Sequence, residues 1–134
     1  MNQRLTIGEL ARETGVKIVT IRYYEQTGVL PVVARSPGNY RLYDPEHARS
    51  LHFIRHCRDL GFSLEQIRQM LRLSSKDSPT CTEICAITAH HLKDIERKAS
   101  HLKRLAAELR RINSTCDGNS RRTECRVIDA LARG

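Results

Sequence analysis

Hydrophobic residues near the start of the chain recur at helical spacing in short segments that turn-forming residues separate. The pattern predicts one helix over residues 7–14 and a second over residues 18–26. Thr6 and Glu9 are spaced as a capping box at the start of the first helix, and Gly28 ends the second. Two short helices joined by a turn that contains glycine outline a helix-turn-helix, whose second helix can enter the major groove of DNA.

The second of these helices carries both apolar and polar side chains. Its period leads us to expect an inward face of Ile18 and Ile21, and a partly outward face of Arg22, Glu25 and one of Tyr23 or Tyr24. The outward face is the candidate surface for contacting DNA.

A different pattern follows over residues 31–43, where the helical period is lost and the Pro-Gly-Asn sequence at residues 37–39 marks a turn. We interpret this segment as a short hairpin or wing. Two further helices are predicted after it. The first begins where Asp44 precedes Pro45, and the second follows another capping box at Ser63.

A much longer helix is predicted over residues 82–112, which contain no proline or glycine. At 1.5 Å per residue it measures about 46 Å. Apolar residues alternate three and four apart along it, which is a heptad seam, at Leu92, Ile95, Ala99, Leu102, Ala106 and Leu109. A lone helix cannot bury this seam, and no other segment is long enough to cover it. We therefore predict a homodimer in which the same helix of a second chain is the partner.

Composition and charge narrow the class of protein. A chain of 134 residues suits one small globular unit, and its net charge of +8 favours polyanionic partners such as nucleic acid. No apolar run reaches the roughly 18 residues that span a bilayer, and the first residues do not resemble a secretory signal, so we expect a cytoplasmic protein without a membrane partner. We find no Ser-His-Asp pattern, phosphate-binding glycine loop or HExxH motif and do not expect an enzyme.

Five cysteines in a reducing compartment suggest metal binding or thiol chemistry rather than a disulfide framework. Cys81 precedes the long helix, whereas Cys116 and Cys125 follow it, too far away to share a site within one chain unless the helix breaks. If two such helices pair antiparallel, Cys81 of one subunit meets Cys116 and Cys125 of its partner. Three thiolates select soft cations and suit three-coordinate mercury or lead, whereas tetrahedral zinc needs a fourth ligand.

The remaining thiols have other interpretations. Cys57 is expected to pack in the interior. Cys85 continues the heptad seam backwards, so it either packs there or serves as an auxiliary ligand. Cys116 and Cys125 also permit an alternative function, a thiol-based redox-sensing regulator in which they form a reversible disulfide.

Several segments, taken in order, resemble the N-terminal domain of the MerR-family transcription regulators. They are TIGELA at residues 6–11, TIRYYE at 20–25, NYRLY at 39–43, FIR at 53–55 and LGFSLEQI at 60–67. The long helix and the terminal cysteine loop are similar to those of the metal-sensing branch of the family, which responds to mercury, lead or cadmium.

The resemblance implies a mainly α fold with three parts. These are a winged helix-turn-helix DNA-binding domain at residues 4–76, a dimerisation helix at 80–113 that forms an antiparallel coiled-coil homodimer, and a metal-binding loop with a short C-terminal helix at 114–134. It also implies binding to double-stranded promoter DNA next to RNA polymerase, at a promoter in which the spacer between the elements that the polymerase reads is overlong. A bound effector then distorts the DNA and changes repression into activation.

The family motifs also imply particular site residues. The implied DNA contacts, with Arg22 as the choice for a base edge, are Thr20, Arg22, Tyr23, Tyr24, Arg35, Asn39, Tyr40, Arg41, Tyr43 and Arg55. The implied metal ligands are Cys116, Cys125 and, from the other subunit, Cys81. The ion is expected to be divalent mercury, lead or cadmium. Copper is disfavoured because the copper sensors carry serine where this chain has Cys81, and zinc because the zinc sensors carry a second cysteine where this chain has Asp117.

Overall fold

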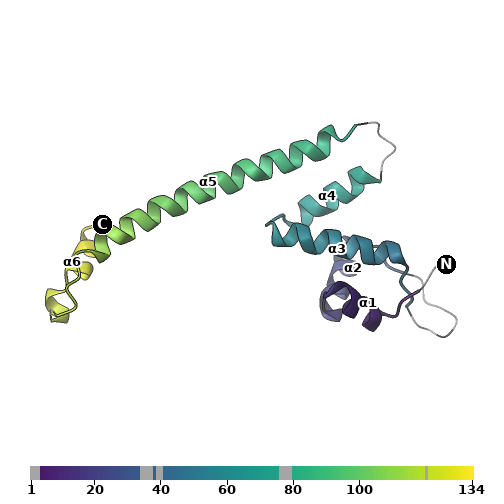
Figure 1. Ribbon diagram of the computed structural model, residues 1–134, viewed down its shortest axis with the longest axis horizontal. Helices are drawn as coiled ribbons and strands as arrows, with labels where there is room; N and C mark the ends of the chain where they lie inside the picture. The colour runs from purple at the N-terminus through teal and green to yellow at the C-terminus, as the bar shows by residue number, and fades with distance from the viewer. Residues whose placement is uncertain (1–3, 34–37, 39–40, 76–79, 120) are drawn as a thin grey trace. The chain divides into compact units, whose positions relative to one another are not determined.

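The structure is a computed structural model, and it describes residues 4–33, 38, 41–75, 80–119 and 121–134. The described residues are mainly helical, as predicted (Figure 1). The helices are α1 (Ile7–Thr14), α2 (Ile18–Thr27), α3 (Pro45–Asp59), α4 (Leu64–Ser74), α5 (Thr82–Asn113), the 3-10 turn η1 (Arg122–Glu124) and α6 (Arg126–Arg133). The chain divides into two compact units, residues 1–87 and 88–134, which are described separately.

Side chains cap the helices at the places predicted from the sequence. The Thr6 hydroxyl accepts a hydrogen bond from the Glu9 backbone N–H at 3.2 Å, and the Ser63 hydroxyl accepts one from Gln66 at 3.1 Å. In both capping boxes the third residue of the helix returns a side-chain bond to the cap. These contacts satisfy backbone donors that the first turn of a helix leaves without partners.

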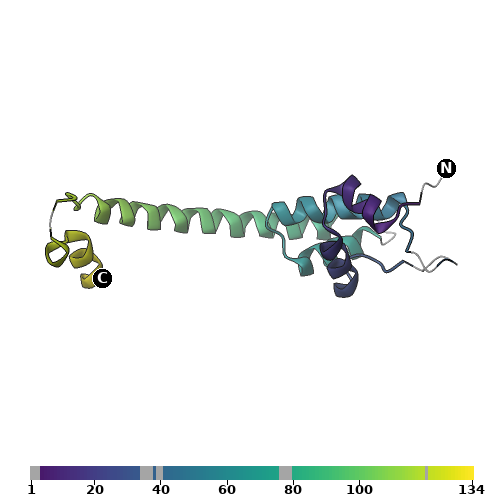
Figure 2. The same cartoon turned by 90° about the horizontal axis from the view of Figure 1, so that it is seen from below.

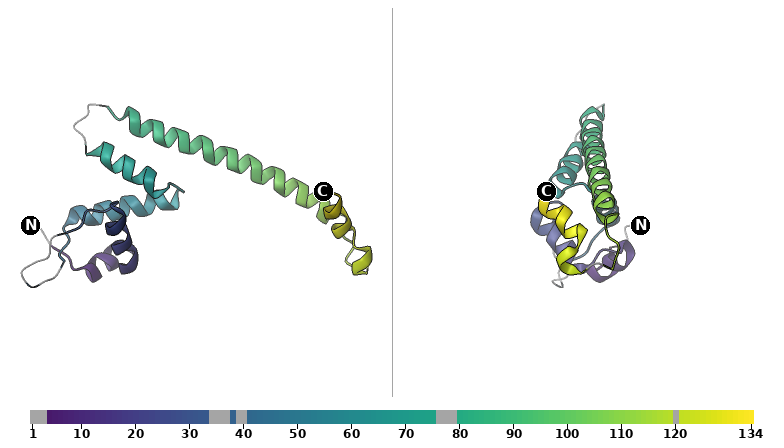
Figure 3. Two further views of the ribbon diagram at one scale, coloured as in Figure 1. Left: turned by 180° about the vertical axis from the view of Figure 1, so that it is seen from behind. Right: turned by 90° about the vertical axis from the view of Figure 1, so that its left-hand side faces the viewer.

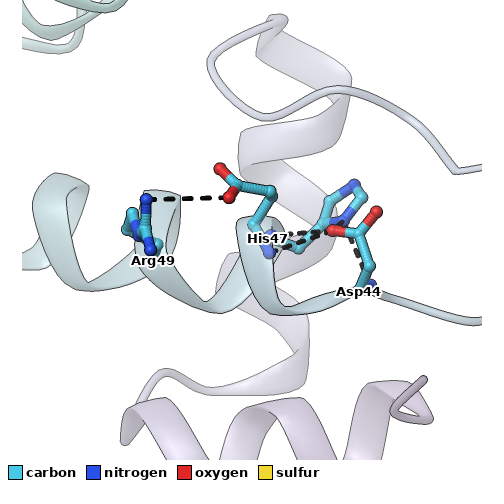
Figure 4. A network of polar contacts seen from close by, with 4 residues as sticks. Asp44, His47 and Arg49 are labelled. Carbon is cyan, nitrogen blue, oxygen red and sulfur yellow. Dashed lines mark hydrogen bonds and ion pairs between the residues drawn. The ribbon is translucent and has the colours of Figure 1, made fainter. Parts of the chain in front are cut away.

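Helix α3 begins with a denser polar cluster around its cap, Asp44 (Figure 4). Asp44 Oδ1 accepts from the Glu46 N–H at 3.0 Å and lies 2.9 Å from His47 Nδ1. The hydrogen bond with His47 is the main cause that lowers the pKa of the Asp44 carboxyl. One turn along, Arg49 Nη1 lies 3.6 Å from a Glu46 carboxylate oxygen. The cluster fixes where the chain leaves the segment predicted as a wing and enters α3.

The core of the first unit lies among α1, α2, α3 and α4, which gather in one bundle (Figure 3). Its fully buried apolar side chains include Leu10, Ile21, Leu30, Leu51, Ile54 and Ile67. Cys57 is buried among them, which confirms its predicted packing role. Ile84 and Ile87, on the first turns of α5, pack partly buried against the same core. The start of the long helix is therefore anchored to the helix-turn-helix unit.

The segment predicted as a wing is described only in part. Its end is tied to the start of the chain by an antiparallel bridge, in which Leu5 and Tyr43 exchange two backbone hydrogen bonds of 2.7 Å. Three of the predicted DNA contacts in the segment, Arg35, Asn39 and Tyr40, lie outside the described residues. The hairpin itself stays a prediction.

Helix α5 is one uninterrupted helix of 32 residues, one residue longer than predicted (Figure 2). At 1.5 Å per residue it is about 48 Å long. Its heptad seam is largely uncovered within the chain, since the Leu92, Leu102 and Leu109 side chains are 58%, 63% and 60% exposed. Among the residues that the structure describes, no helix is long and apolar enough to cross a bilayer.

Candidate functional site

The outer face of α2 presents the residues predicted to meet DNA. Arg22 is exposed, Tyr23 is 50% exposed and Thr20 is half-buried. Val19 lies on the same face and is also exposed. This face is accessible to a groove or to phosphates.

The inner face of α2 differs from the prediction. Ile18 is more than one third exposed, whereas Glu25, expected to point outward, is only 6% exposed. Glu25 lies four residues after Ile21, which is fully buried, so the two side chains share one helix face. The four-residue spacing from Ile21 therefore indicated that Glu25 is buried, but the charge of Glu25 favoured an exposed position.

Buried Glu25 is held by two residues at the end of the predicted wing. The Tyr43 hydroxyl donates to Glu25 Oε1 at 2.9 Å, and Arg41 Nη1 lies 3.6 Å from the same oxygen. Burial, followed by the hydrogen bond to Glu25, raises the pKa of Tyr43 above its ordinary value. This cluster connects α2 to the residues before α3.

Two of the predicted DNA contacts are buried in this structure. Tyr43 is fully buried and Tyr24 is only 9% exposed, with both rings in the core. The Tyr43 side chain cannot reach DNA in this conformation, and Tyr24 offers little surface to it. Both side chains pack in the core and Tyr43 also holds Glu25, so a DNA contact by Tyr24 stays a prediction.

Two arginines donate hydrogen bonds to carbonyl groups at the C-terminal ends of α1 and α2. Arg55, on α3, donates from Nη1 to the Thr14 carbonyl at the end of α1 at 2.8 Å, and Arg68, on α4, donates to the Thr27 carbonyl at the end of α2. These carbonyls lack helical partners, so the guanidinium groups satisfy them. Arg55 thus has a structural role, and its DNA contact stays a prediction for its remaining donors. Arg68 was not singled out from the sequence, because its partner lies 41 residues away.

Cys116 and Cys125 line one small pocket in the second unit. The pocket has a volume of about 100 Å³ and is lined by Thr115, Cys116, Asp117, Gly118, Cys125 and Arg126. Cys116 follows α5 by three residues, and Cys125 directly precedes α6. Directly after Cys116, Asp117 Oδ1 accepts a hydrogen bond from the Asn119 N–H at 3.0 Å. The structure thus brings together two of the three predicted metal ligands.

Cys81 lies at the other end of α5, beside Cys85. The two sulfur atoms are 3.4 Å apart, and both residues are exposed. The hydrogen bond with Cys81 is the main cause that raises the pKa of Cys85. Among the described residues of a single chain, no group of three or more His, Cys, Asp or Glu side chains is placed to hold a metal ion.

Known proteins resemble this chain over most of its length. The family profile described as "MerR HTH family regulatory protein" matches residues 5–74, and that described as "MerR, DNA binding" matches residues 48–112. The HTH-type transcriptional regulator HmrR of Sinorhizobium medicae (strain WSM419) is 35% identical over 130 residues, covering 97% of this chain and 88% of that protein.

Solved structures agree with these sequence matches. The transcription regulator PbrR691 from Ralstonia metallidurans CH34, in complex with lead(II), has a TM-score of 0.85 and 37% identity, covering 95% of this chain and 98% of that one. The dual-function regulator MerR from Bacillus megaterium MB1, in complex with mercury(II), has a TM-score of 0.74 and 33% identity, covering 96% of this chain and 99% of that one.

The helix-turn-helix unit, with the accessible face of α2, defines a DNA-binding transcription regulator. The matched segments extend from residue 5 to residue 112, and the relatives span nearly the whole chain. The chain belongs to the MerR family of helix-turn-helix regulatory proteins. The resemblance inferred from its motifs is confirmed.

Proposed function

We propose that this protein is a metal-responsive regulator that binds promoter DNA as an antiparallel homodimer and activates transcription when a soft divalent ion binds its cysteine thiolates. The observation that carries the proposal is the long helix α5. It has an uncovered apolar seam along its length, one thiol pair at its start and a second thiol pair in a pocket just beyond its end.

The exposed seam supports the dimer. Burying a leucine side chain contributes about 1.5–3 kcal/mol, and each chain offers Leu92, Leu102 and Leu109. Pairing with a second copy of α5 buries all of them on both helices. The antiparallel direction is favoured because about 48 Å of helix separates Cys81 from Cys116, so only a reversed partner brings the start of one helix beside the end of the other.

The donor set fits a soft ion. In the antiparallel arrangement, Cys116 and Cys125 from one pocket are joined by Cys81 of the partner subunit, which gives three sulfur donors. Thiolates select mercury, lead and cadmium over hard cations. PbrR691 and MerR of B. megaterium, which were solved with lead and mercury, support this choice by their similarity.

Sensing requires the thiol sites to be coupled to DNA. An ion that cross-links two chains stabilises one dimer geometry over others. Because Ile84 and Ile87 anchor the start of α5 to the helix-turn-helix core, a change in how the two long helices pair shifts the two DNA-binding units. On a promoter with an overlong spacer, this shift distorts the bound DNA and realigns the elements that RNA polymerase reads.

Replacing Cys116 with serine tests the proposal. We expect Cys116→Ser to abolish metal-induced run-off transcription from the protein's own promoter while operator binding stays intact. Cys57→Ala, which removes a buried thiol of the first unit, is the matched control and should remain inducible. Induction by peroxide without added metal, lost in Cys116→Ser and Cys125→Ser, would instead favour the redox alternative and refute metal sensing.

A further inference from the structure

We infer that Cys85 is a fourth sulfur ligand, so that the site takes four thiolates and suits a tetrahedral ion such as cadmium or zinc. The inference rests on the proposed function, in which Cys81 meets Cys116 and Cys125 of the partner subunit. It goes further by adding a residue to the site and by changing the class of ion that the site fits.

The distance between the two sulfur atoms fits two ligands of one tetrahedral ion. The Sγ atoms of Cys81 and Cys85 are 3.4 Å apart. With metal–sulfur bonds of about 2.3 Å, as for zinc, two sulfurs of a tetrahedral site are about 3.8 Å apart, whereas a linear two-coordinate site needs about 4.6 Å. The pair is therefore within about 0.4 Å of the tetrahedral spacing, which small side-chain rotations can supply.

The position of Cys85 on α5 directs it toward the predicted partner. Cys85 precedes Leu92 by seven residues, and a seven-residue step returns to the same side of a helix in a coiled coil. Leu92 belongs to the seam that we propose faces the second chain. Cys85 therefore lies on the side from which the partner's thiols would approach.

Packing in the core does not account for Cys85. It is exposed, whereas its neighbours Ile84 and Ile87 are the residues of this turn that pack against the core. The four-residue spacing of Cys81 and Cys85 at the start of α5 places their sulfur atoms side by side. The two sulfurs are therefore placed to act on one ligand.

A fourth thiolate changes the selectivity expected of the site. Three sulfurs suit three-coordinate mercury or lead, but four sulfurs in tetrahedral geometry are typical of zinc, and cadmium accepts the same donors. The objection that a tetrahedral ion lacks one ligand is then removed. The protein should therefore coordinate cadmium through sulfur alone.

X-ray absorption spectroscopy of the full-length reduced protein loaded with cadmium alone tests this inference. We expect four sulfur neighbours per cadmium in the natural protein, and three sulfurs with one lighter atom in Cys85→Ser. The thiolate-to-cadmium absorption should fall by about one quarter in the same variant, in proportion to the thiolates lost. Cys57→Ser is the control for loss of an unrelated thiol, and circular dichroism checks that the variants keep their helices.

The outcomes separate the inference from the proposed function. Three sulfurs in the natural protein and an unchanged spectrum in Cys85→Ser would overturn the inference while leaving the three-thiolate site in place. Cadmium binding that survives unchanged in Cys116→Ser would instead refute the shared site and the proposed function with it. Loss of one sulfur in each of Cys85→Ser and Cys116→Ser supports both.

Discussion

Removing the Tyr43 hydroxyl should destabilise the DNA-binding unit, because Glu25 is buried and depends on it. In Tyr43→Phe the ring keeps its place in the core, but Glu25 Oε1 loses the donor at 2.9 Å and, among the described residues, keeps only Arg41 at 3.6 Å. Glu25 Oε2 already has no hydrogen-bond partner among the described residues. A hydrogen bond to a charged group contributes about 1.5–3 kcal/mol, so we expect a loss of about 2 kcal/mol in the free energy of unfolding.

The measurement is urea unfolding followed by circular dichroism, with the protein concentration fixed because a dimer is stabilised by mass action. For a unit of this size, 2 kcal/mol corresponds to a fall of roughly 10 °C in Tm. Glu25→Gln and the double variant complete a mutant cycle, in which we expect the two changes to be non-additive. A loss below about 0.5 kcal/mol in Tyr43→Phe, within the range of an ordinary surface substitution, would refute the role assigned to this contact.

The same contact predicts a dependence on pH. Burial, followed by the hydrogen bond to Glu25, raises the pKa of Tyr43 in the folded protein above its ordinary value of 10.0, so the protonated hydroxyl stabilises the fold below pH 10 and this stability is lost as pH rises through the folded pKa. The stability difference between the natural protein and Tyr43→Phe should therefore shrink above pH 10. A constant difference across that range would contradict the assignment.

Three other changes test the remaining parts of the molecule. Leu102→Glu places a charge in the exposed seam and should shift the protein toward monomer in sedimentation velocity. The control Lys103→Glu changes the neighbouring residue off the seam and should leave the dimer intact. Equal effects of the two substitutions would argue against the seam as the interface. Arg22→Ala should weaken operator binding. If Arg22 contacts a phosphate, the slope of the logarithm of the binding constant against the logarithm of salt concentration should fall by about one. If Arg22 contacts a base, the slope should stay unchanged and the sequence preference should be relaxed. Asp44→Ala removes the cap of α3 and should cost about 1 kcal/mol in urea unfolding. In the folded protein the pKa of Asp44 lies below its ordinary value of 3.8. The stability difference between the natural protein and Asp44→Ala should therefore be present above pH 3.8 and disappear as the pH falls through the folded pKa. A stability difference that persists in acid would exclude the carboxylate as its source.

The features that the sequence predicted well depend on neighbours along the chain. A capping box joins residues three apart, and a heptad seam repeats within one helix, so Thr6, Ser63 and the whole of α5 were predictable from local pattern. The loop between Cys116 and Cys125 is similarly local. Its two thiols were expected to act together, and they line one pocket.

The features that the sequence did not predict depend on residues far apart. Glu25 is buried because Tyr43, 18 residues later, supplies its partner, and Arg55 is drawn to a carbonyl 41 residues earlier. Nothing in the local pattern indicates which distant residue supplies the partner, so Glu25 was expected on the outward face because of its charge. The contact between Cys81 and Cys85 is different, because their four-residue spacing was visible and predicts neighbours on a helix.

Because α5 is uninterrupted, its length sets both the distance between its two ends and the rotation of one end relative to the other about the helix axis. Each inserted residue would advance the following residues by 1.5 Å and turn them by about 100° around the axis, so a single insertion would carry the loop of Cys116 to another side. Additions of about seven or eleven residues, which complete nearly whole turns, would restore the direction in which the far end points. Changes in the length of this segment should therefore come in steps of about seven or eleven residues, whereas single substitutions on its exposed surface leave the direction of the far end unchanged.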